Sequence, residues 1–145
     1  AVTSSNTRVG ARSGCSPQTC IEGTSVSSCQ AFTAELDRRN GGLSAKDDPT
    51  GKHKPYLMID GTTATIVVGI GATPGNEGAL IHPMSPSDVA DDVHWISHVY
   101  ARDDMGNLVA LCELLPSHPA PASCTFEVPS GIVFLRPYEF CNKHG

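Results

Sequence analysis

Hydrophobic and polar residues alternate with a period of two along much of the chain after residue 55, which is typical of β-strands with one buried face. The alternation is clearest from Val93 to Arg102, and one face of this run is expected to be core. Runs rich in β-branched and aromatic residues, bounded by Gly, Pro and Asn, predict strands over 56–60, 62–70, 94–103, 107–115, 124–128 and 132–140. Six or seven short strands at such intervals predict an all-β antiparallel sandwich.

The pattern changes in the N-terminal part of the chain. Residues 1–26 are rich in Ser, Thr and Gly and lack hydrophobic periodicity, which predicts a surface arm. A capping-box spacing begins at Ser27, and Phe32 and Leu36 fall on one face of a helix. We therefore predict a short helix from about residue 28 to residue 39, with Phe32 and Leu36 packed on the sandwich.

The length of 145 residues is enough for one domain with a core and too short for two ordinary domains. We expect a β-domain over residues 51–145, preceded by a cysteine-containing N-terminal extension over residues 1–50. Charged residues make up 17% of the chain, the net charge is −5 and no basic run is present, so nucleic acid and anionic membranes are not expected partners. The longest apolar stretch, residues 64–70, is too short to span a bilayer.

Six cysteines are a high number for a protein of a reducing cytosol. Cys112 and Cys124 flank a short loop, and a disulfide between them would contribute about 3 kcal/mol. Cys15, Cys20 and Cys29 would then supply one more bridge and one free or intermolecular thiol. The alternative is that all of them are buried reduced thiols. The cysteine content favours a periplasmic or extracellular location, with the cytoplasm as the second choice.

Four histidines and one cysteine carry the candidate chemistry. Cys141 and His144 lie three positions apart in Cys-Asn-Lys-His-Gly, so their thiolate and imidazole can bind one metal ion together. His53, His82 and His94 are candidate co-ligands in Lys-His-Lys-Pro, His-Pro-Met and His-Trp-Ile. Imidazole and thiolate suit iron, copper or zinc, and a set of five exceeds the tetrahedral four of structural zinc, which favours iron. Two further histidines are expected to be structural: His98 and His118.

Taken in order, Lys-His-x-Pro, His-Pro-Met, His-aromatic-Ile and Cys-Asn-x-His-Gly resemble the signature of the superoxide reductases, the desulfoferrodoxin and neelaredoxin family. The resemblance runs from Lys52 to Gly145, and the first 50 residues match nothing in that family. It implies an immunoglobulin-like β-sandwich with a mononuclear iron on loops at one end. It also implies ligation by the four histidines and Cys141, with the position opposite the cysteine left open.

The resemblance further implies one-electron reduction of superoxide to hydrogen peroxide, with superoxide as substrate and a rubredoxin-like or other protein as electron donor. Lys52 occupies the position of the family lysine that attracts superoxide and helps organise a proton-donating water. Some members hold a second iron on four N-terminal cysteines, but the three cysteines here lack that number and spacing, so no second iron is expected. The alternative is a structural or electron-transfer subunit of a larger assembly that retains the iron site, and a homo-oligomer also remains open.

Two features depart from the family pattern. Gly51 stands where the family commonly has a glutamate that closes the sixth position of the oxidised iron, so water, hydroxide or an added anion is expected there instead. The eleven residues 83–93 between the second and third histidines exceed what the family usually places there. Within them, Ser85 to Asp88 predicts an inserted turn or short helix.

Overall fold

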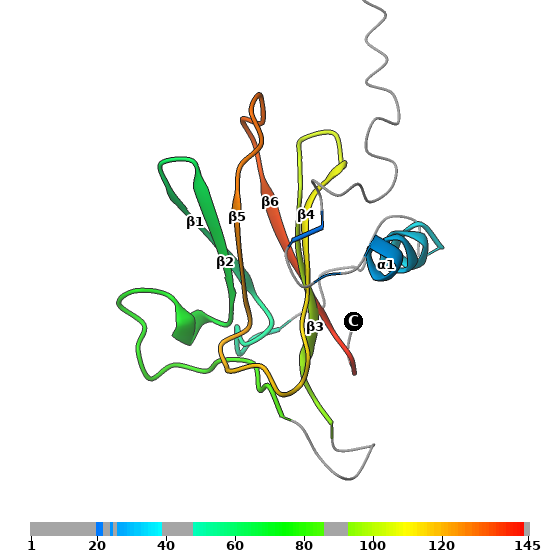
Figure 1. Cartoon of the computed structure of the whole chain (residues 1–145). Helices are drawn as coiled ribbons and strands as arrows, with labels where there is room; N and C mark the ends of the chain where they lie inside the picture. Colours follow the sequence, from blue (N-terminus) through cyan, green and yellow to red (C-terminus); the bar gives the residue numbers. More distant parts are fainter. Residues whose placement is uncertain (1–19, 22–23, 25, 39–47, 86–92, 144–145) are drawn as a thin grey trace, which may run out of the picture.

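The computed structural model describes residues 20–21, 24, 26–38, 48–85 and 93–143. In this part of the chain six strands form two three-stranded antiparallel sheets that enclose a common core (Figure 1). The predicted all-β antiparallel sandwich is confirmed. No helix among the described residues is both long enough and apolar enough to cross a membrane.

The first sheet has the strand order β1-β2-β5, and the second has the order β4-β3-β6. The bounds of the first three are β1 Pro55–Asp60, β2 Thr63–Val68 and β5 Ser123–Glu127. Those of the second three are β3 Ile96–Arg102, β4 Leu108–Glu113 and β6 Arg136–Cys141. A short 3-10 helix, η1 (Ile70–Ala72), follows β2. The predicted strand over 62–70 ends early because Gly69, with φ of 99°, turns the chain away from the sheet.

Buried residues of both sheets form the core, and they alternate with exposed ones most regularly in β5. In β5 the side chains of Cys124 and Phe126 are buried while Thr125 between them is exposed, as expected for a strand with one solvent-exposed face. Residues of β2 fill the core from the same sheet, and residues of β3 and β4 meet them from the other: Ala64, Ile66, Val68, Val99, Ala101, Val109 and Ala110. The hydrophobic effect of burying these side chains holds the two sheets together.

A disulfide between Cys112 and Cys124 joins β4 to β5 across the sandwich, with 5.8 Å between the Cα atoms. The predicted bridge is therefore present. Cys29 is also disulfide-bonded and Cys20 is a free thiol, in agreement with one bridge and one free thiol among the cysteines of the extension. Cys15 lies outside the described residues.

Strand β3 departs from simple alternation. Ile96 and Val99, three residues apart, both reach the inner core because the pairing of β3 with β6 shifts register between Ile96 and His98. The outer face of β3 is buried as well, since helix α1 (Val26–Arg38) lies over it (Figure 1). Phe32 of α1 stacks on His98 with 4.0 Å between ring centroids. The predicted helix and the packing of Phe32 are confirmed, while the side chain of Leu36 lies outside the described part.

The extension also covers the edge of β4. Cys20 forms a parallel bridge with Leu111, and the N–H of Ile21 donates to the Leu111 carbonyl at 3.1 Å. The N–H of Glu113 donates to the Thr24 hydroxyl at 2.8 Å. These contacts occupy backbone groups that an uncovered edge strand would offer to other chains. The division of the chain at residue 50 stays a prediction.

Candidate metal centre

Loops and strand ends at one end of the sandwich bring the candidate ligands together. His53 precedes β1, His82 follows η1, and Cys141 is the last residue of β6. A ring nitrogen of each histidine and the sulfur of Cys141 all lie within 4.8 Å of one another. His94, just before β3, adds a third ring. The ring centroid of His82 lies 4.5 Å from that of His94 and also 4.5 Å from that of His53. His144, the fifth predicted ligand, lies outside the described residues.

The spacing of these atoms suits one metal ion. Metal–nitrogen bonds of about 2.1 Å and metal–sulfur bonds of about 2.3 Å place the ligand atoms around one ion about 3 to 4.5 Å apart. The ligand atoms of the cluster, which all lie within 4.8 Å of one another, are therefore close to the separations that one ion requires. Cys141 is fully buried and is present as a thiol, so its sulfur is available as a ligand after loss of the proton.

His82 has the properties of a ligand. Its side chain is fully buried, and its Nδ1 lies 2.8 Å from the Pro83 carbonyl, which places the proton on Nδ1 and the lone pair on Nε2. Among the described residues, that buried Nε2 has no hydrogen-bond partner. Burial lowers the pKa of His82 to about 4, and nearby positive charges act in the same direction. A neutral ring with an unused buried lone pair is what a metal ion requires, because such an atom is otherwise costly to bury.

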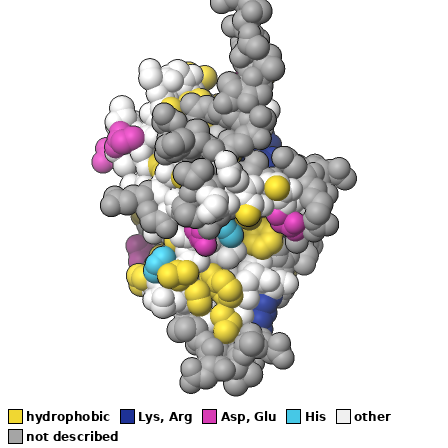
Figure 2. Space-filling view, turned by 45° about the vertical axis from the view of Figure 1, so that its right-hand side comes forward, with side chains coloured by type: hydrophobic (Ala, Val, Ile, Leu, Met, Phe, Trp, Pro, Cys, Tyr) yellow, Lys and Arg dark blue, Asp and Glu magenta, His cyan; other side chains and the backbone are white. Residues whose placement is uncertain are grey.

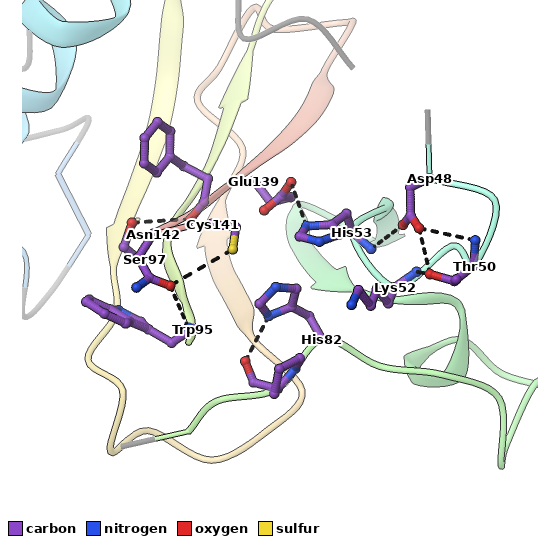
Figure 3. A network of polar contacts seen from close by, with 12 residues as sticks. Asp48, Thr50, Lys52, His53, His82, Trp95, Ser97, Glu139, Cys141 and Asn142 are labelled. Atoms are coloured by element: carbon purple, nitrogen blue, oxygen red, sulfur yellow. Dashed lines mark hydrogen bonds and ion pairs between the residues drawn. The ribbon is translucent and has the colours of Figure 1, made fainter. Parts of the chain in front are cut away.

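Asn142 ties two ligand segments together. The N–H of Trp95 donates to its side-chain oxygen at 2.9 Å, and its side-chain amide donates to the Val93 carbonyl at 2.8 Å. Its backbone N–H donates to the Trp95 carbonyl at 3.1 Å. The segment that carries His94 is thereby held against the end of the strand that carries Cys141 (Figure 3). Sequence reasoning used Asn142 only as part of a motif and missed this contact.

Two glycines allow the chain to bring His82 into place. The N–H of Gly71 donates to the Leu80 carbonyl at 3.0 Å, and a Cβ on Gly71 would lie 2.0 Å from the Ala79 carbonyl oxygen. A Cβ on Gly69 would lie 2.8 Å from the Cα of Ile81. The turn after β2 therefore packs directly on the backbone that leads to His82. Two glycines one residue apart, Gly69 and Gly71, indicate such a close backbone approach, but sequence reasoning did not use this pattern.

Gly51 has a conformational role in the loop before His53. Its φ is 72°, in the region that favours glycine, and its carbonyl accepts hydrogen bonds from the N–H groups of Lys54 and Ile70 at 3.3 and 3.1 Å. A Cβ here would also lie 3.4 Å from a side-chain carbon of Ile70. A residue with a side chain would be strained in this conformation.

Glu139 is a member of the site that sequence reasoning missed. Its Oε1 lies 3.7 Å from Nδ1 of His53, and burial, helped by the Asp48 charge, raises the pKa of Glu139 to about 8. Its other oxygen is buried without a hydrogen-bond partner among the described residues. Carboxylates that face the second nitrogen of a ligand histidine commonly orient the ring. The sequence did indicate that Glu139 lies on the same side as Cys141, because residues 139 and 141 of one strand point to the same face.

Lys52 lies beside the cluster and is partly buried. Its side chain runs from the loop toward His82 (Figure 3), and its positive charge is one of the causes that lower the pKa of that histidine. Lys and Arg side chains are sparse among the described residues on the face shown in Figure 2. On a chain of net charge −5, the Lys52 ammonium places a positive charge beside the cluster.

The two histidines expected to be structural have structural contacts. His98 stacks on Phe32, and its Nδ1 lies 2.9 Å from the Ser97 hydroxyl. His118 accepts a hydrogen bond from the N–H of Leu115 at 3.0 Å and stays within its loop. Most of the predicted insertion, residues 86–92, lies outside the described residues, including the turn or helix expected there.

Among solved structures, the chain is similar to the superoxide reductase from Treponema pallidum, with a TM-score of 0.51 and 26% sequence identity. The similarity covers 72% of this chain and 70% of that chain. No family model matches the sequence, and no curated protein matches it. The chain thus has the fold of a superoxide reductase, together with a His/Cys group that can hold a metal ion.

Proposed function

We propose that the chain is a superoxide reductase that binds one iron ion and reduces superoxide to hydrogen peroxide with an electron from a donor protein. The proposed ligands are His53, His82, His94, Cys141 and His144. The observation that carries the proposal is the group of His53, His82 and Cys141, whose ligand atoms lie within 4.8 Å of one another. The similarity to a solved superoxide reductase supports the same assignment.

The kinds of ligand favour iron among the metals that bind nitrogen and sulfur. Neutral imidazoles leave the positive charge of a ferrous ion in place, and a single thiolate adds electron density. Iron held by these histidines and Cys141 would supply the one electron that superoxide needs, with two protons, to leave as hydrogen peroxide, and a donor protein would return that electron. The lowered pKa of His82 keeps that ring neutral at physiological pH, so it retains its lone pair.

The remaining residues guide the anion and hold the ligands. The Lys52 ammonium attracts superoxide, because it adds positive potential beside the cluster on an otherwise negative protein. Glu139 faces the His53 ring and Asn142 fixes the His94 segment, so both keep ligands in place without reacting.

The test is rapid mixing of the iron-loaded, reduced protein with superoxide, comparing wild type with Lys52→Ala. The matched control is Lys54→Ala, which removes an exposed lysine two positions away, where the ammonium lies over the Tyr56 ring at 5.8 Å. We expect the rate to fall by about tenfold for Lys52→Ala at low ionic strength and to change little for Lys54→Ala. Iron-loaded protein that is not oxidised by superoxide would instead support the structural or electron-transfer subunit.

A further inference from the structure

Asp48 forms the centre of the loop that carries His53. Its Oδ2 accepts a hydrogen bond from the backbone N–H of His53 at 2.7 Å. Its Oδ1 accepts from the hydroxyl of Thr50 at 2.6 Å and from the Thr50 N–H at 3.2 Å. The backbone carbonyl of Asp48 accepts from the N–H of Gly51 at 3.1 Å. One carboxylate therefore spans the loop from its first described residue to the candidate ligand (Figure 3).

These bonds are made by a charged group. Partial burial works in the opposite direction, but the hydrogen bonds from Thr50 and His53 hold the pKa of Asp48 below its ordinary value. Asp48 is thus an anion at neutral pH, and hydrogen bonds to an anionic acceptor are stronger than those between neutral groups. The His53 contact, at 2.7 Å, is at the short end of the range for N–H donors.

His53 is consequently held from two sides. Asp48 binds its backbone N–H, and Glu139 faces its ring nitrogen at 3.7 Å. The backbone contact fixes where the Cα of His53 lies, and the ring contact favours one orientation of the side chain. A shift of the backbone would move the ring away from His82 and Cys141, and a ligand histidine tolerates displacements of only about half an ångström.

We propose that Asp48 is a positioning residue of the metal centre: by binding the backbone N–H of His53, its carboxylate places the imidazole where it meets His82 and Cys141 on one ion. The inference rests on the proposed metal centre. Asp48 acts through His53 and does not itself bind the metal. Its role is separate from that of Gly51, which allows the turn but provides no group that holds the ligand.

The experiment titrates metal-free protein with Co²⁺, whose absorption bands report bonding to a thiolate. Loss of these bands in Cys141→Ser assigns that thiolate to Cys141 and not to the free thiol of Cys20. Asp48→Ala removes the carboxylate that accepts from Thr50 and His53. Asp48→Asn removes the charge but keeps one oxygen, which can accept from the His53 N–H while the amide group donates to the Thr50 hydroxyl. The Thr50 N–H loses its acceptor in this variant, so the His53 contact is the one that it preserves. If position is what matters, Asp48→Ala weakens Co²⁺ binding about tenfold or more, and Asp48→Asn stays within about threefold of wild type.

The matched control is Glu127→Ala. Glu127 is, like Asp48, a carboxylate that accepts hydrogen bonds from hydroxyls, those of Thr62 and Thr63 at 2.7 and 2.6 Å, but it lies at the end of β5 beside the β1–β2 turn. Its loss should leave Co²⁺ binding unchanged. Thermal unfolding of each metal-free variant shows whether the fold is intact.

A double-mutant cycle separates positioning from general loop damage. In a His53→Ala background, the further change of Asp48→Ala should have no effect on Co²⁺ binding, because the ligand through which Asp48 acts is gone. The inference is overturned if Asp48→Ala binds within threefold of wild type, if Asp48→Asn is as weak as Asp48→Ala, or if the effect persists without His53. Wild-type protein that shows no thiolate bands with Co²⁺ would refute the metal centre itself, and this inference with it.

Discussion

Trp95 and Asn142 are joined in both directions: the Trp95 N–H donates to the Asn142 side chain at 2.9 Å, and the Asn142 N–H donates to the Trp95 carbonyl at 3.1 Å. The pair connects the segment of His94 with the strand end of Cys141. Asn142→Ala removes the first of these bonds and the bond to Val93. We expect Co²⁺ or Fe²⁺ affinity to fall about tenfold, the size typical of residues that orient ligands. Isothermal titration of the metal-free protein measures it.

The control for this prediction is Asn107→Ala. Asn107 also uses its side-chain amide in a loop, donating to Asp103 at 3.0 Å, but it lies at the β3–β4 turn. Its loss should reduce stability slightly and leave metal affinity unchanged. Equal affinities for wild type and Asn142→Ala would show that the two segments keep their places without this side chain.

Gly71→Ala should disturb the site by steric overlap. The new Cβ would lie 2.0 Å from the Ala79 carbonyl oxygen, so the backbone leading to His82 must move. We expect a loss of about 1 to 3 kcal/mol in the free energy of unfolding, the usual cost of overpacking, together with weaker metal binding. Urea denaturation and Co²⁺ titration measure the two effects.

Gly75→Asn is the matched change in the same region. Among the described residues nothing lies within 4 Å of a Cβ at Gly75, and asparagine tolerates the positive φ of 83° there. This variant should keep both stability and metal affinity. If Gly71→Ala also kept its metal affinity, the close approach of the two segments would not matter for the placement of His82.

His98 should make stability depend on pH. Burial lowers the pKa of His98 to about 4, with the Glu113 charge acting in the opposite direction, whereas an unfolded chain titrates near 6.5. The unfolded chain therefore binds more protons between these values, so the contribution is present above pH 6.5 and is lost as pH falls toward 4. We expect wild type to lose about 1 to 2 kcal/mol more than His98→Phe between pH 7 and pH 5.

Urea denaturation of the metal-free proteins at both pH values measures this difference. His98→Phe keeps an aromatic ring against Phe32, and the Ser97 hydroxyl retains the Phe140 carbonyl as an acceptor at 3.2 Å. His118→Asn, which removes an exposed histidine, should retain the wild-type dependence on pH. If His98→Phe lost as much stability as wild type between pH 7 and pH 5, His98 would not be the source of the pH dependence.

The sequence was sufficient to predict the sandwich because a period of two survives in most strands. It was insufficient for β3, where two features depend on contacts between distant segments. A register shift puts Ile96 and Val99 on the same side, and α1 buries the face that a lone strand would expose to water. The predicted strand over 132–140 likewise begins only at Arg136, because local pattern does not fix where pairing starts.

The candidate ligands could be predicted because histidine and cysteine are metal-ligating residue types and because their order along the chain is recognisable. The residues that hold them could not, with Asp48 and Asn142 as examples, since their roles lie in hydrogen bonds to particular backbone groups. Glu139 is an intermediate case. It lies two residues before Cys141, and this spacing indicates that both side chains point to the same face of β6, but only the fold shows that His53 lies opposite. His144, the assignment of iron and the catalytic role of Lys52 stay predictions.

The central claim is that histidines and Cys141 bind one metal ion together. X-ray absorption at the iron edge of the reconstituted protein tests it most directly, because the fine structure separates sulfur from nitrogen neighbours. We predict one equivalent of iron with a single sulfur at about 2.3 Å in addition to nitrogen ligands, and loss of the sulfur signal in Cys141→Ser. An iron bound only through nitrogen and oxygen in the wild-type protein would contradict the account.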